Sequence, residues 1–87
     1  MTDVKGVNCA PNMVTTVFYG RTRFKGIWYS TSAPTKIVIK DGSVTLFTFV
    51  ITTPSSDNIL IPGDGVLCSS GLIVILDKHV FAVVFHG

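Results

Sequence analysis

TKIVIKDGSVTLFTFVIT spans Thr35–Thr52 and holds two runs rich in β-branched and aromatic residues on either side of Asp41-Gly42. Asp-Gly between two alternating runs is a strong hairpin signal, because both central residues of a type I′ turn need a positive φ. The stretch therefore predicts two antiparallel strands joined by a tight type I′ turn at Asp41-Gly42.

Alternation sorts the side chains of this hairpin onto two faces. In the second strand one face carries Phe47, Phe49 and Ile51, and the other carries Val44, Leu46, Thr48, Val50 and Thr52. A hairpin alone is marginally stable in water, so other strands must cover the phenylalanine face.

The composition favours a single all-β domain. The 87 residues include no Glu or Gln, and Val, Ile and Thr dominate, as is typical of strands. Hydrophobic residues make up 47% of the chain and charged residues only 14%, against about 25% in an average protein. We therefore expect other chains to cover part of the apolar surface. The net charge of +2 would not by itself drive binding to nucleic acid or membranes.

Turn residues divide the chain into seven to eight short strands. Besides the hairpin, the predicted strands are Val14–Tyr19, Arg21–Ser30, Ile59–Ile61, Val66–Cys68, Leu72–Leu76 and Val80–Phe85. This pattern predicts a small antiparallel β-sandwich or jelly-roll-like domain over residues 14–87, with a small barrel as the alternative. Residues 53–58 are expected to form a polar loop. Residues 1–13 show no periodicity and are expected to be an N-terminal arm, either loose or laid across a neighbour.

Two positions in the chain carry cysteine, Cys9 and Cys68, and their spacing is not that of a metal site. The sequence contains no secretory signal, so we expect two buried, reduced thiols rather than a disulfide. No apolar run reaches the length of about 18 residues that a membrane-spanning helix needs.

Catalytic chemistry is not indicated by the sequence. The only histidines, His79 and His86, lie seven residues apart, and several of the aspartates fall in apparent turns, where Asp is expected for backbone reasons. Since no nucleophile, base and orienting group are brought together, we predict no enzyme activity and no catalytic, cofactor-binding or metal-binding residues.

A basic stripe is the most functional-looking feature. Arg21, Arg23 and Lys25 share one face of a predicted strand, and Gly26 suggests a bulge that would move Ile27 and Tyr29 to the opposite face. Cations interleaved with aromatic residues are typical of single-strand nucleic-acid binders, although solvated cations or ion pairs to a neighbouring subunit would give the same pattern. We assign the nearby aromatic residues Phe24 and Trp28 to the core.

The last two predicted strands are apolar on both faces. A strand in a two-layer sandwich normally wets one face, and a chain of this size cannot supply a third layer. We therefore predict a subunit interface on the last strand, formed by Phe81, Val83 and Phe85. The alternative is that these strands are central in a tightly curled barrel.

The chain resembles a family of small structural proteins of marine and cyanobacterial tailed phages. The resemblance is carried by five runs: Lys25–Ser30 (KGIWYS), Lys36–Gly42 (KIVIKDG), Ile59–Leu67 (ILIPGDGVL), Gly71–Val74 (GLIV) and Val83–Phe85 (VVF). It implies a virion component, either a capsid decoration (cement) protein that binds the major capsid protein as a homo-oligomer, expected to be a trimer, or a tail, fibre or receptor-binding accessory protein. An OB-like binder of single-stranded nucleic acid is the remaining alternative, and no membrane partner is expected.

Overall fold

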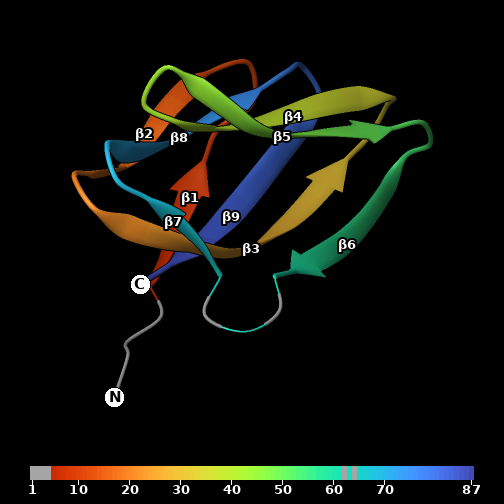
Figure 1. Ribbon diagram of the computed structural model, residues 1–87. Coiled ribbons are helices and arrows are strands. Elements are labelled where there is room, and N and C mark those ends of the chain that lie inside the picture. Colours follow the sequence, from red (N-terminus) through yellow and green to blue (C-terminus); the bar gives the residue numbers. More distant parts are fainter. Residues whose placement is uncertain (1–4, 62, 64) are drawn as a thin grey trace.

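The computed structural model describes residues 5–61, 63 and 65–87. The described residues form nine strands in two facing antiparallel sheets (Figure 1). The strands are β1 (Lys5–Cys9), β2 (Val14–Tyr19), β3 (Thr22–Thr31), β4 (Thr35–Asp41), β5 (Val44–Ile51), β6 (Ser55–Leu60), β7 (Val66–Cys68), β8 (Gly71–Leu76) and β9 (Val80–His86). The prediction of a small all-β sandwich is confirmed. None of the described residues belongs to a helix long and apolar enough to cross a membrane.

The two sheets differ in their strand order, and in one of them the long strand β3 pairs with two strands on the same side. The four-stranded sheet has the order β2-β8-β4-β5. The five-stranded sheet has the order β1-β9-β3-β6, with β7 also paired to β3. Strand β3 is ten residues long, so its first three residues pair with β7 and its last six pair with β6.

The β4–β5 hairpin forms as predicted, but its turn is of a different kind. Asp41 pairs with Val44, which leaves Gly42-Ser43 as the two-residue connection. Within this connection Gly42 alone has a positive φ, of 58°, which matches a type II′ turn rather than type I′. Asp41 is instead a strand residue whose carboxylate accepts hydrogen bonds from the backbone N–H groups of Ser69 and Ser70, at 3.2 and 2.8 Å.

The inner face of this hairpin is covered unevenly. Ile37 and Ile39 are fully buried, whereas Phe47 and Phe49 remain half-buried because β5 is the edge of its sheet. The pairing of β4 with β5 shifts register after Ile39, and Leu46 packs against the core instead of lying on the predicted outer face.

One segment that was not predicted as a strand, and one predicted as a strand only from Ile59 onward, complete the five-stranded sheet. Lys5–Cys9, within the expected N-terminal arm, pairs with β9 of the same chain, and residues 1–4 lie outside the described residues. Ser55–Leu60 pairs with β3, so the expectation of a loop over residues 53–58 is wrong for most of that segment. The main-chain hydrogen bonds offered by β3 outweigh the low strand propensity of Ser, Asp and Asn.

The core lies between the sheets. It consists of Cys9, Val17, Phe24, Ile27, Tyr29, Ile37, Ile39, Ile51, Cys68, Leu72, Val74, Leu76, Val80, Ala82 and Val84. Cys9 and Cys68 are both buried and free, as predicted. Burial raises the pKa of both thiols, so both are held as neutral SH groups.

Candidate binding surface on the five-stranded sheet

The outer face of the five-stranded sheet gathers aromatic side chains from β3 and β9. Phe81, Val83 and Phe85 alternate with buried residues along β9 and therefore point away from the core. Trp28 lies opposite Val83 on β3, and its ring centroid is 5.5 Å from that of Phe81. We refer to Trp28, Phe81, Val83 and Phe85 as the aromatic surface.

The bulge predicted at Gly26 explains how Trp28 reaches this surface. The register between β3 and β9 shifts between Phe24 and Gly26, and Ile27 and Tyr29 point into the core, as expected. The same shift turns Trp28 outward, so the assignment of Trp28 to the core is wrong. Phe24, on the other side of the bulge, is fully buried, and its assignment is confirmed.

Two glycines flank Phe85 on the neighbouring strands. Gly6 of β1 and Gly26 of β3 are both register partners of Phe85. A Cβ at Gly6 would lie 3.5 Å from the Phe85 ring, and a Cβ at Gly26 would meet the carbonyl oxygen of Ile59 at 2.7 Å. Neither register partner therefore places a side chain beside the Phe85 ring, and at Gly26 it is the close approach of β6 that leaves no space for one.

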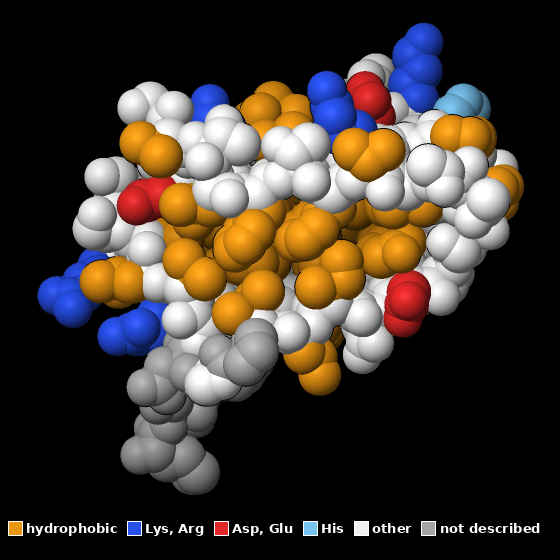
Figure 2. Space-filling view, turned by 45° about the vertical axis from the view of Figure 1, so that its right-hand side comes forward, with side chains coloured by type: hydrophobic (Ala, Val, Ile, Leu, Met, Phe, Trp, Pro, Cys, Tyr) orange, Lys and Arg blue, Asp and Glu red, His pale blue; other side chains and the backbone are white. Residues whose placement is uncertain are grey.

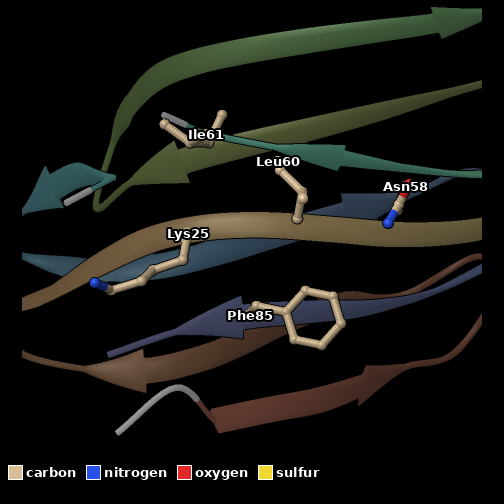
Figure 3. Close-up of a pocket in the computed structure, with 5 residues that line it drawn as sticks. All are labelled: Lys25, Asn58, Leu60, Ile61 and Phe85. Atoms are coloured by element: carbon tan, nitrogen blue, oxygen red, sulfur yellow. The ribbon is translucent and has the colours of Figure 1, made fainter. Parts of the chain in front are cut away.

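A shallow hollow adjoins the Phe85 ring. It has a volume of about 420 Å³ and is lined by Lys25, Asn58, Leu60, Ile61 and Phe85 (Figure 3). Figure 3 shows the Phe85 ring and the Leu60 side chain on opposite sides of β3, with Lys25 and Asn58 toward the two ends. Leu60 is 67% exposed. The hollow therefore has apolar walls from Leu60, Ile61 and Phe85, together with the cation of Lys25 and the amide of Asn58.

The predicted basic stripe is partly assembled at the same place. Arg23 and Lys25 lie on the outward side of β3, at the end where Phe85 also lies. Arg21 lies in the exposed connection before β3 and is not part of the sheet. Among the described outward-facing residues of the five strands no carboxylate occurs, so the charge on this face is entirely positive.

Sequence reasoning missed three contributors to this surface: Trp28, Asn58 and Leu60. Trp28 could have been found by carrying the Gly26 bulge one residue further along β3. Asn58 lies opposite Trp28, and Leu60 lies opposite Gly26, but their place on β6 depends on pairing with β3. The local sequence of β6 contains Ser, Asp and Asn, which have low strand propensity, so it does not predict that pairing.

The titratable groups elsewhere do not converge. His79 lies in the exposed β8–β9 turn, whereas His86 is buried beside Thr22, whose Oγ1 lies 3.2 Å from Nδ1 of His86. The described residues contain no cluster of three or more His, Cys, Asp or Glu side chains suited to a metal ion. The aromatic surface and its adjoining cations are therefore the site with the clearest binding chemistry.

Comparison with known proteins gives no further guide. No family model matches the chain, and neither a curated protein nor a solved structure matches it.

Proposed function

We propose that this protein is a phage virion structural protein, a capsid decoration (cement) protein that assembles with copies of itself and binds the coat shell. The observation that carries the proposal is the aromatic surface, where Phe81 remains 48% exposed in the single chain. Complete burial of a Phe side chain stabilises a protein by about 1.5–3 kcal/mol, so an interface that covers Phe81 would lower the free energy of the assembly. The resemblance to small tailed-phage proteins supports the virion setting.

The mechanism that we propose is clamping by a symmetric oligomer. Each copy, expected in a trimer, buries its aromatic surface against a neighbour, and closed symmetry keeps an apolar chain from polymerising. The exposed loops then contact the major capsid protein. A small binding energy per copy, repeated over many sites on a shell, stabilises the whole particle.

Sedimentation of the purified protein tests the self-assembly. We expect an oligomer at tens of micromolar, and we expect Phe81→Ser to weaken it because Phe81 lies in the proposed contact. Val14→Ser is the matched control, since Val14 is 63% exposed but lies on the other sheet. A wild-type protein that stays monomeric at these concentrations would overturn the proposal.

Particle composition tests the location. Quantitative mass spectrometry of purified particles should find this protein at the copy number of a shell component, in the hundreds. A few copies per particle would instead support the alternative role as a tail, fibre or receptor-binding accessory protein.

A second candidate function, binding of single-stranded nucleic acid, is favoured by one specific observation. Arg23 and Lys25 share a face with the rings of Trp28, Phe81 and Phe85, and the described outward positions of this face carry no carboxylate, which suits phosphate contacts beside stacked bases. Trp28 is the only tryptophan of the chain, so its fluorescence reports on this face directly.

A fluorescence titration with an oligonucleotide separates the two functions. If this second function holds, the Trp28 emission changes on binding, the affinity falls as salt is raised, and Arg23→Ala with Lys25→Ala abolishes binding. Lys36→Ala with Lys40→Ala, on strand β4 of the other sheet, is the control. An emission that does not respond to the oligonucleotide rules this function out.

A further inference from the structure

Edge strands are the second place where this molecule can meet a partner. Among the described strands, β1, β2, β5, β6 and β7 each pair with a neighbour on one side only. A free edge presents unpaired backbone N–H and C=O groups that can pair with another chain. Natural proteins block such edges with short strands, bulges, charges or proline.

Four of the five edges carry one of these protections. Strand β7 has three residues, and β1 has five and begins at Lys5. Strand β2 is bulged between Thr16 and Phe18. Strand β6 follows Pro54 and carries Asp57.

Strand β5 lacks them over most of its length. Its bulge lies at the start, and from Phe47 to Ile51 its pairing with β4 is regular. Between Asp41 and Pro54 the sequence holds no charged residue and no proline. The segment Phe47–Ile51, FTFVI, is therefore an unprotected, apolar free edge.

The same edge leaves part of the core uncovered. Phe47 and Phe49 point inward, stack with ring centroids 5.7 Å apart, and are only half-buried. Figure 2 shows a band of hydrophobic side chains between the two layers on the side of the molecule where β5 and β6 lie. A strand added at the β5 edge would place further side chains beside these two rings.

We propose that the β5 edge pairs antiparallel with the β5 edge of a second copy, which joins two four-stranded sheets into one continuous sheet. The segment is complementary to itself about a two-fold axis through Phe49. Phe47 of one copy then lies opposite Ile51 of the other on the inner face, and Thr48 lies opposite Val50 on the outer face. Apolar side chains therefore meet apolar ones on the core side, and the free main-chain groups are paired.

This contact lies on a different sheet from the aromatic surface, so it does not depend on the proposed function. Thr48 and Val50 are exposed in the single chain, and Val50 is 69% exposed. The double change Thr48→Lys with Val50→Lys thus costs the folded monomer little. Across the proposed two-fold axis it places like charges opposite each other, which disfavours pairing.

Sedimentation of the Phe81→Ser variant tests the edge contact with the aromatic surface disabled. We expect this variant to form a dimer whose dissociation constant rises by about tenfold or more when Thr48→Lys and Val50→Lys are added. Val14→Lys with Thr16→Lys, at the opposite edge of the same sheet, should leave the dimer intact. A monomeric Phe81→Ser variant, or a dimer that survives the lysines at 48 and 50, overturns the edge contact.

The result also separates the two proposals. If Phe81→Ser does not change the wild-type mass but the two lysines do, edge pairing stands and self-assembly through the aromatic surface fails. If the two lysines prevent folding, Val50→Lys alone replaces them, because a lysine on an apolar edge strand also disfavours pairing. Amide hydrogen exchange gives a second readout, since pairing protects alternate amides within Phe47–Ile51 in wild type but not in the lysine variant.

Discussion

Strands β8 and β9 are consecutive and almost equally apolar, yet they lie in different sheets and present different outer faces. Each is an interior strand, β8 between β2 and β4, and β9 between β1 and β3. Their inner residues are equally buried: Leu72 and Val74 of β8 are 0% exposed, and so are Val80 and Val84 of β9. The two strands differ only on the side that faces away from the core.

The neighbours create this difference. On β8, Ile75 lies between Val14 and Val38, and Ile73 lies between Thr16 and Lys40. The outer face of β8 is therefore flanked by β-branched and long side chains. On β9, Phe85 lies between two glycines and lines the hollow, and Phe81 is 48% exposed. The chemistry of an outer strand face is thus set by the residues paired beside it as much as by the strand itself.

The largest expected effect separates inner from outer positions. Leu72→Ala should lower the free energy of unfolding by about 2–5 kcal/mol, because it leaves a cavity in the core. Phe81→Ala should lower that of the monomer by only about 1 kcal/mol, since about half of the side chain is already exposed. Urea denaturation at a concentration low enough to keep the protein monomeric measures both. Equal losses would mean that β9 has no true outer face.

A smaller effect is expected at the glycines that flank Phe85. Gly26→Ala should destabilise the fold by about 1–3 kcal/mol, because its Cβ would meet the rigid backbone carbonyl of Ile59 at 2.7 Å. Gly6→Ala is the matched variant, and its Cβ would meet the movable side chain of Val83 at 3.2 Å. We expect it to cost less in the same urea titration. If Gly26→Ala is tolerated as well as Gly6→Ala, the close approach of β3 to β6 is not what requires glycine.

The local pattern was enough to predict both strands of this comparison, but not where they lie. Alternation and turn residues located β8, β9 and the β4–β5 hairpin, and a mid-strand glycine located the bulge. The three-residue turn Asp77–His79 carries the chain from one sheet to the other, with a positive φ of 69° at His79. A connection of that length is also suited to a hairpin, so sequence spacing could not choose between the two.

The candidate site was predictable to a similar extent. Alternation within each strand determines which residues face outward: Phe81, Val83 and Phe85 on β9, and Arg23 and Lys25 on β3. Leu60 and Asn58 join them only through pairing between β6 and β3, which are separated by two strands in the sequence. Such long-range pairing depends on the whole fold rather than on any local preference.

An effect of about 1 kcal/mol is expected where β8 begins. Asp41 accepts two backbone hydrogen bonds from the turn that leads into β8, and Asp41→Ala removes both. Asp77→Ala, at the other end of β8, should cost less, because there the backbone carbonyl accepts the hydrogen bond, from the N–H of Asn12 at 3.0 Å. Thermal denaturation of the two variants compares the ends of the strand. A larger loss for Asp77→Ala would show that the Asp41 carboxylate does not hold this turn.

The smallest effect is expected from protonation at the end of β9. Burial, and secondarily the positive charge of Lys5, lower the pKa of His86 below its usual value of 6.5. Because the unfolded chain then binds a proton more readily than the folded one, stability is full above about pH 7 and falls as the pH drops toward 5. His86→Gln stays neutral and can still bond the Thr22 hydroxyl, so it should flatten this part of the stability–pH curve. Urea midpoints between pH 5 and 8 measure both proteins, and a wild-type midpoint that rises on acidification would reverse the sign assigned to His86.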